Sequence, residues 1–229
     1  IYKKKILVEY KQDKSPLTLA DKKANEIIKK GLRKLPLNFP ILSEEDKEIE
    51  YEVRKNWEYF WLVDPLDGTK EFISKNDQFT VNIALIHKNF PVIGVVYAPA
   101  LDICYWAKKS EGAFKDGKKL PLKQKKSETV KIIISRSHMT KETKEFVENF
   151  ETHKDREFIS IGSSLKICLI AEGAADIYPR LGPTMEWDTG AAHAIVDESG
   201  KKLQKYENNK LTPHLYNKIN LVNKNFIVR

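Results

Sequence analysis

The spacing of apolar side chains changes along this chain, and each change predicts an element. Between residues 18 and 35 they recur every three or four positions, at Ala24, Ile27, Ile28 and Leu32. That period predicts an amphipathic helix, and Thr18-Leu19-Ala20-Asp21 has the form of a capping box at its start. Residues 39–42 read as a short extended segment.

A run of strands is predicted next. Residues 59–63 are apolar without alternation, as in a strand buried on both faces, and the run ends at Asp64. Further strand patterns cover 79–86, 92–97 and 103–107, and Asp116-Gly117 predicts a hairpin turn.

The polar stretch 121–130 is the best candidate for a boundary within the chain. Beyond it, strand and helix patterns alternate, which favours a more parallel sheet in the second half. The predicted strands are 131–135, 157–161 and 176–179, and the predicted helices are 141–150, 163–173 and 188–199.

Composition narrows the class of protein. The chain has 229 residues, 41% of them hydrophobic and 31% charged, so it can bury a sizeable core. Its two cysteines, Cys104 and Cys168, exclude a disulfide scaffold, and no Cys/His cluster suggests zinc. No apolar run is long enough to span a bilayer. The chain begins at Ile1 without a methionine, so we expect a segment to precede it.

The net charge of +8 has two interpretations. Only six of the 40 basic residues are arginine, and the lysines are interleaved with acids along the whole chain. A nucleic-acid-binding surface more often clusters arginine with aromatic residues, so we expect no nucleic-acid partner. The lysines form either a solvated surface or a modest positive field that attracts an anionic small substrate.

The segment from Asp64 to Thr69 carries the chemistry. A buried strand delivers Asp64 and Asp67 three residues apart, and Pro65 and Gly68 permit a tight backbone. The two carboxylates and the Leu66 carbonyl can then converge, and hard divalent cations prefer such oxygen ligands. An ordinary Pro-x-Asp-Gly turn is the alternative.

Three other acids stand where an element begins or ends, and each has a structural alternative. Asp21 fits the capping box, Glu44 fits the first turn of a helix, and Asp188 fits a helix N-cap. Sites between layers also collect their ligands at such positions.

Together these motifs resemble the lithium-sensitive, magnesium-dependent phosphatase superfamily that includes inositol monophosphatases. Within it, the sequence looks most like bacterial 3'(2'),5'-bisphosphate nucleotidases of the CysQ type. The segments that carry this closer resemblance are 40–45, 64–72, 79–86, 135–138, 160–166, 178–184 and 187–188. An inositol monophosphatase would typically have Thr-Asn-Phe in place of Lys70-Glu71-Phe72.

The resemblance implies a fold and a division of the chain. The expected fold is a layered α/β sandwich (α+β) with alternating helix and sheet layers. Residues 1–127 would form a subdomain with a largely antiparallel sheet and most metal ligands, and residues 128–229 an α/β subdomain with substrate-binding residues.

It also implies roles for residues. Two or three Mg²⁺ ions would be bound by Glu44, Asp64, the Leu66 carbonyl, Asp67 and Asp188. Asp21 and Thr69 would orient the attacking water. The amides of Gly68 and Thr69 would hold the scissile phosphate, so the substrate also lies against Glu44, Leu66, Asp67 and Asp188.

A second anion site would distinguish the substrate. Lys166, Arg180 and Ser163 are suited to a phosphate that is not cleaved, which a nucleoside 3',5'-bisphosphate has and inositol monophosphate lacks. Lys166 and Arg180 could instead be surface charges, and His138 either touches the base or sugar or is structural. His193 reads as a core or partner contact.

The leading functional hypothesis is a phosphatase that converts adenosine 3',5'-bisphosphate to AMP and phosphate in sulfur metabolism. An inositol monophosphatase-like or broad sugar phosphatase is the runner-up, and a non-catalytic nucleotide-binding module would lack one of the site residues. We expect a monomer or homodimer, in the cytoplasm or attached peripherally to the cytoplasmic face of the inner membrane.

Overall fold

The structure is a computed structural model that describes residues 2, 8–10, 16–123, 128–135, 140–150 and 152–229. The elements of its first half are β1 (Val8–Tyr10), β2 (Pro16–Thr18), α1 (Leu19–Leu32), β3 (Ile41–Ser43), α2 (Tyr51–Arg54), β4 (Tyr59–Asp67), α3 (Thr69–Ser74), β5 (Thr80–His87), β6 (Phe90–Ala98), β7 (Ile103–Lys108), β8 (Gly112–Lys115) and β9 (Lys118–Lys119).

The elements of its second half are β10 (Thr129–Ile134), α4 (Lys141–Glu148), β11 (Asp155–Ser160), α5 (Leu165–Glu172), β12 (Tyr178–Arg180), β13 (Thr184–Met185), α6 (Glu186–Glu198), β14 (Leu203–Glu207), β15 (Lys210–Pro213), β16 (Val222–Asn223) and β17 (Phe226–Val228).

The first half forms a seven-stranded sheet with the order β3-β4-β5-β6-β7-β8-β9. Every neighbouring pair is antiparallel except β3 and β4, which run parallel. The sequence therefore predicted a largely antiparallel sheet correctly. The predicted hairpin turn is also present, with positive φ angles at both Asp116 and Gly117.

The second half is less parallel than its alternating pattern suggested. β10 and β11 are parallel, and Ile132 forms a parallel bridge with Ile177 just before β12. The four-stranded sheet β12-β17-β14-β15 is antiparallel throughout. Its strands come from the last part of the chain, where the sequence pattern resolved only short strands.

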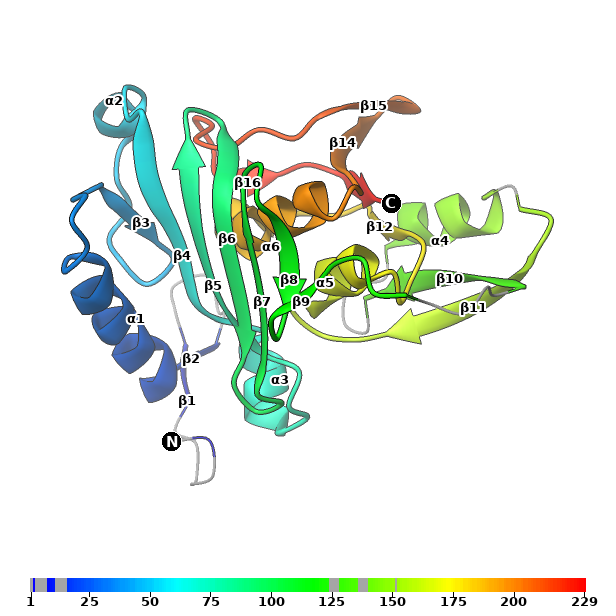
Figure 1. Ribbon diagram of the computed structural model, residues 1–229, viewed down its shortest axis with the longest axis horizontal. Helices are drawn as coiled ribbons and strands as arrows, with labels where there is room; N and C mark the ends of the chain where they lie inside the picture. The colour runs from blue at the N-terminus through cyan, green and yellow to red at the C-terminus, as the bar shows by residue number, and fades with distance from the viewer. Residues whose placement is uncertain (1, 3–7, 11–15, 124–127, 136–139, 151) are drawn as a thin grey trace.

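Helices and sheets alternate through the molecule (Figure 1). α1 covers one face of the seven-stranded sheet, where Ile28 and Leu32 pack around Trp61 and Val63. α5 and α6 lie between that sheet and the strands of the second half, and α4 packs on the outside of those strands. The predicted layered sandwich is confirmed.

One continuous core runs through the predicted boundary between the subdomains. It joins Phe60 and Leu62 of the seven-stranded sheet to Cys168 of α5, Ile195 of α6 and Val228 near the C-terminus. The division at residues 127 and 128 stays a prediction, and residues 124–127 lie outside the described part of the chain.

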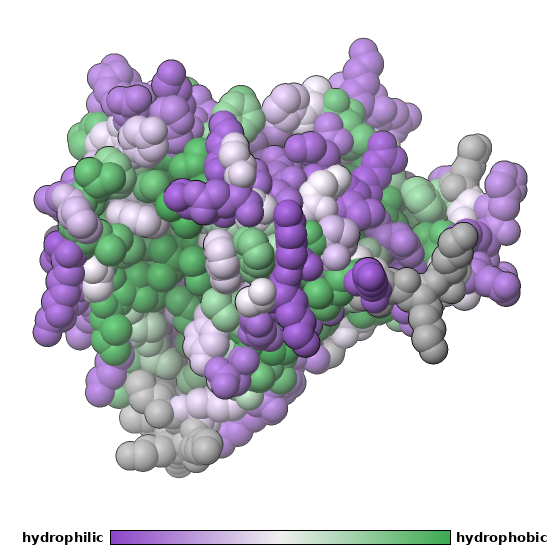
Figure 2. Space-filling model, viewed as in Figure 1, coloured by the Kyte–Doolittle hydropathy of each residue, from purple (hydrophilic) through white to green (hydrophobic). Residues whose placement is uncertain are grey.

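Hydrophilic and hydrophobic residues are interspersed over the visible face of the molecule (Figure 2). No helix among the described residues is long and apolar enough to cross a membrane.

Candidate active site

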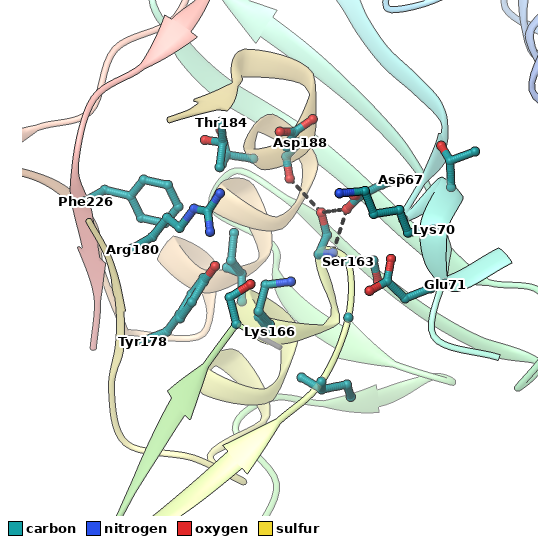
Figure 3. A pocket seen from close by; sticks show the side chains of 18 of the residues that line it. Asp67, Lys70, Glu71, Ser163, Lys166, Tyr178, Arg180, Thr184, Asp188 and Phe226 are labelled. Carbon is teal, nitrogen blue, oxygen red and sulfur yellow. Dashed lines mark hydrogen bonds between the residues drawn. The ribbon is translucent and has the colours of Figure 1, made fainter. Parts of the chain in front are cut away.

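A pocket of about 240 Å³ opens between the end of β4, the start of α5, β12 and the first turn of α6 (Figure 3). Eight of the predicted site residues line it: Glu44, Asp67, Gly68, Thr69, Ser163, Lys166, Arg180 and Asp188. Predicted residues from both halves of the chain therefore meet at one place. Asp21, Asp64 and Leu66 are buried and do not line the pocket, and His138 lies outside the described residues.

A β-bulge places Asp64 and Asp67 on one side of β4. The sequence predicted that the strand ends before Asp64, but β4 continues to Asp67. Asp64 pairs with Asn82 and Asp67 with Thr80, so β4 holds one extra residue here. Residues three apart in a regular strand face opposite ways, and the bulge corrects that.

Leu66 and Gly68 fix the backbone around the two acids. The Leu66 side chain is buried with Phe72 and Phe79, and its N–H donates to Asp64 Oδ1 at 3.0 Å. Gly68 has a φ of +88°, which favours glycine, and it directly precedes α3. The predicted tight turn is therefore present as a bulge followed by a left-handed residue.

Glu44 follows strand β3, and its N–H donates to the Val63 carbonyl. The helix alternative for this residue is wrong, because residues 41–43 pair in parallel with β4. This pairing brings Glu44 to the end of β4 beside Asp64.

Asp188 is the third residue of α6 and takes part in its capping box, so it is not the N-cap residue of the structural alternative. α6 begins at Glu186, and Asp188 Oδ2 accepts a hydrogen bond from the N–H of Met185 at 2.8 Å. The Asp188 carboxylate thus accepts a hydrogen bond from a backbone N–H at the helix start that has no partner within the helix.

Asp21 occupies the capping box that the sequence pattern predicted. Its Oδ2 accepts hydrogen bonds from the Thr18 N–H at 2.8 Å and the Thr18 hydroxyl at 2.5 Å. The Thr69 hydroxyl donates to the Leu66 carbonyl at 3.5 Å, and no hydrogen bond joins Asp21 to Thr69. β2, which runs directly into α1, nevertheless packs against α3, so the first turn of α1 with Asp21 begins close to the helix that Thr69 starts.

Mutual repulsion among the acids gives the site its electrostatic character. Burial, and next the charge of Glu44, raise the pKa of Asp64 well above its ordinary value, and Asp67 and Asp188 act in the same direction. Burial followed by the charge of Asp67 also raises the pKa of Asp188, which Arg180 partly offsets. Such a cluster is stabilised by cations.

The donor set fits a hard divalent cation. In each of Asp64, Asp67 and Asp188, one carboxylate oxygen accepts hydrogen bonds. The second oxygen of each carboxylate receives no hydrogen bond from the described residues. The buried Oδ1 of Asn82 also has no partner in this part of the chain. Carboxylate and amide oxygens are the ligands that magnesium takes.

No three His, Cys, Asp or Glu side chains in the described ranges form a ready-made cation site. The metal ligands therefore stay a prediction.

Lys166 and Arg180 lie on the side of the pocket away from Asp67 and Glu71, beside which Lys70 stands (Figure 3). Lys166 is the second residue of α5, which begins two residues after its predicted start, and Arg180 is the last residue of β12, one residue beyond the predicted strand end. The Lys166 ammonium lies 6.0 Å from the ring centroid of Tyr178, and Arg180 donates to the Pro183 carbonyl. Burial lowers the pKa of Lys166, and the charge of Asp67 opposes that effect.

Arg180 is only 8% exposed, so the surface-charge alternative for it is wrong. His193 is a core residue, 3% exposed, and its Nδ1 lies 3.0 Å from the Tyr216 hydroxyl.

Ser164 is a site residue that the sequence analysis named only within a motif. Its N–H and hydroxyl both reach Asp67 Oδ2, at 2.6 and 2.7 Å, and the hydroxyl lies 2.6 Å from the Asp188 carbonyl oxygen. Asn82 donates to both Ser164 and Asp67. These residues join β4, β5, α5 and α6 at the site.

The fold and this pocket define a class of protein. The family model of the inositol monophosphatase family matches residues 1–226, and the chain belongs to this family.

More specific similarities follow. The 3'(2'),5'-bisphosphate nucleotidase CysQ of Buchnera aphidicola is 45% identical over 224 residues, which cover 96% of this chain and 83% of that protein. The protein of the same name in Salmonella typhimurium is 47% identical over 203 residues, 88% of this chain and 80% of that one.

Among solved structures, CysQ from Bacteroides thetaiotaomicron aligns with a TM-score of 0.86 and 44% identity, over 95% of this chain and 86% of that chain. The resemblance to nucleotidases of the CysQ type is confirmed.

Proposed function

We propose that this chain is a 3'(2'),5'-bisphosphate nucleotidase. It hydrolyses the 3'-phosphate of adenosine 3',5'-bisphosphate to AMP and phosphate, and it also accepts 3'-phosphoadenylyl sulfate, in sulfur assimilation and nucleotide recycling. The similarity to proteins of that name supports the reaction. The observation that carries the substrate is the pocket, which has acids at one end and Lys166 with Arg180 at the other.

Two or three Mg²⁺ ions would be held by Glu44, Asp64, the Leu66 carbonyl, Asp67 and Asp188. Bound there, Mg²⁺ would neutralise charge on the phosphate and leaving oxygens and make water more acidic. The raised pKa values of Asp64 and Asp188 support this ligand set, because burial and then mutual repulsion disfavour their charges, and a bound cation would offset both effects.

The other residues near these metal ligands would bind the phosphate and orient the water. The amides of Gly68 and Thr69 would donate to the scissile phosphate at the start of α3. Asp21 and Thr69 would position the attacking water, which requires the Thr69 hydroxyl to turn from the Leu66 carbonyl. Water held close to the phosphorus reacts faster because less motion is lost in the transition state.

Lys166, Arg180 and Ser163 would bind the uncleaved 5'-phosphate. Charge-assisted hydrogen bonds to a phosphate are strong, and a guanidinium can donate two of them in parallel. An inositol monophosphate offers no second phosphate, so these cations would meet no anion. That mismatch favours the nucleotidase over an inositol monophosphatase-like or broad sugar phosphatase.

Phosphate release tests the proposal. The purified chain is incubated with adenosine 3',5'-bisphosphate or inositol 1-phosphate, each with Mg²⁺ and with excess EDTA. We expect Mg²⁺-dependent release that is much faster from the bisphosphate. Equal rates on the two substrates would favour the runner-up, and undiminished release in EDTA would exclude the metal mechanism.

A further inference from the structure

Asn223 lies behind the first turn of α6, in a strand that the proposed site does not use. β16 pairs antiparallel with β13, which places Asn223 opposite Thr184. The residue is 1% exposed, and Thr184 stands beside Asp188 on one wall of the pocket (Figure 3). A buried amide therefore lies directly against the segment that leads to Asp188.

The donor side of this amide holds the start of α6. Asn223 Nδ2 lies 2.8 Å from the Met185 carbonyl oxygen, 3.2 Å from the Thr184 hydroxyl and 3.0 Å from the Thr189 hydroxyl. Met185 immediately precedes α6, and Thr189 follows Asp188. The amide thus contacts residues on both sides of Asp188.

The acceptor side fixes which way the amide faces. Asn223 Oδ1 lies 3.1 Å from Lys218 Nζ and 3.1 Å from His214 Nε2. An ammonium only donates and the Met185 carbonyl only accepts, so the amide oxygen faces Lys218 and its nitrogen faces Met185. Lys218 in turn donates to Glu186 at 2.6 Å, and Glu186 is fully buried.

Met185 connects Asn223 to Asp188 through its two backbone hydrogen bonds. Its carbonyl accepts from Asn223, and its own N–H donates to Asp188 Oδ2 at 2.8 Å. Asp188 Oδ1 receives no hydrogen bond from the described residues, so in this part of the chain the Met185 N–H is the donor that holds the carboxylate.

We propose that Asn223 is a positioning residue for Mg²⁺: through Met185 it aims the Asp188 carboxylate at the cation. The inference rests on the proposed function, in which Asp188 is a metal ligand. Groups that orient metal ligands typically change metal affinity 10- to 100-fold when they are removed.

Calorimetry of Mg²⁺ binding, without nucleotide, tests this role with Asn223→Ala and Ser199→Ala. Ser199 is a matched control because it is 7% exposed and its hydroxyl donates to the Val196 carbonyl, at the end of α6 away from Asp188. We expect both variants to unfold at lower temperature. Only Asn223→Ala should weaken Mg²⁺ binding, by about 10- to 100-fold, and raise the Mg²⁺ concentration for half-maximal phosphate release by the same factor.

An unchanged affinity in Asn223→Ala, an equal loss in both variants, or a wild-type chain that binds no Mg²⁺ would overturn the inference. If Asn223→Ala does not fold, Asn223→Asp keeps the acceptor for Lys218 and His214 and removes the donor to Met185. It should weaken Mg²⁺ binding although it adds a negative charge. A wild-type chain that binds Mg²⁺ but does not hydrolyse adenosine 3',5'-bisphosphate would refute the proposed function alone.

Discussion

Asp67 is held by one of its two carboxylate oxygens. Oδ2 accepts from the N–H and hydroxyl of Ser164, and it lies 3.3 Å from Asn82 Nδ2 and 3.5 Å from the Thr80 hydroxyl. These donors come from two different elements, β5 and the start of α5. They fix the rotation of the carboxylate, so the direction of Oδ1 is set before any cation binds.

Arg180 provides the sharpest test of substrate choice. Losing one charge-assisted contact to the 5'-phosphate costs roughly 1.5–3 kcal/mol, or about 10- to 150-fold in kcat/KM. Arg180→Ala should therefore impair hydrolysis of adenosine 3',5'-bisphosphate by that factor and barely change hydrolysis of 3'-AMP. Steady-state kinetics on the two substrates checks this. Equal losses would mean that Arg180 supports structure through Pro183 and does not read the second phosphate.

Asp64→Asn tests the repulsion among the acids. The folded-state pKa of Asp64 is raised, so the folded protein binds more protons than the unfolded chain, and stability falls as the pH rises above about 4. In metal-free protein at pH 8 the variant should be more stable than wild type, because a buried neutral amide replaces a buried charge that Glu44, Asp67 and Asp188 repel. The difference should shrink towards pH 4.

Urea unfolding at several pH values measures this difference, with Asp176→Asn on the surface as control. Added Mg²⁺ should stabilise wild type more than the Asp64 variant. A variant less stable than wild type in EDTA at pH 8 would refute the repulsion argument.

The site acids could be found from sequence, and their partners could not. Asp64, Asp67 and Asp188 are polar residues at the ends of apolar runs, which is a local pattern. Ser164 and Asn223 act through residues distant in sequence, so no spacing indicates their role. The bulge that aligns Asp64 with Asp67 depends on pairing with β5, and it was missed for the same reason.

At the scale of elements, α6 is seated on the seven-stranded sheet through small residues. An ideal Cβ on Gly94 of β6 would lie 2.1 Å from the Ala191 carbonyl oxygen and 2.9 Å from the Ala194 Cβ. Helix and strand therefore approach as closely as a glycine allows. The position of Asp188 in the first turn of α6 depends on this contact.

Gly94→Ala should consequently damage both stability and the site. Overpacking typically costs 1–3 kcal/mol, and contact with backbone puts this variant at about 3 kcal/mol. Thermal unfolding and phosphate release measure the two effects. In the control Gly31→Ala, the new Cβ meets nothing within 4 Å inside α1, and a gain of about 0.5–1 kcal/mol is expected. Equal stability of the two variants would contradict the close-packing argument.

At the scale of the whole molecule, the order of layers followed from the resemblance, and the periodicity placed most helices. α1, α4, α5 and α6 each begin within two residues of the predicted start. The pairing of the C-terminal strands was not predictable, because β12, β14 and β17 are brought together by the tertiary fold.

A buried histidine makes the stability of the molecule sensitive to acid. Burial, helped by the charges of His193 and Lys218, lowers the pKa of His214 to about 3. The stability that neutral His214 contributes is fully present above pH 6.5. It is lost as the pH falls towards 3, because the unfolded chain binds a proton that the folded protein does not. Between pH 7 and pH 5 the loss is about 2 kcal/mol.

In urea unfolding, the free energy of unfolding of His214→Gln should fall less between pH 7 and pH 5 than that of wild type. That of the exposed His153→Gln should fall as much as that of wild type. If the two variants lose the same stability on going from pH 7 to pH 5, His214 is not the acid-sensitive group.

The pocket lining also sets an order of events during synthesis. Glu44 and Asp67 are translated early, whereas Phe226 lies on the opposite wall and belongs to β17, which pairs with the β12 strand that carries Arg180. Asn223, which braces α6, leaves the ribosome equally late. The seven-stranded sheet can therefore be synthesised in full before β17 exists, and the wall that carries Arg180 is complete only once β17 has paired with β12.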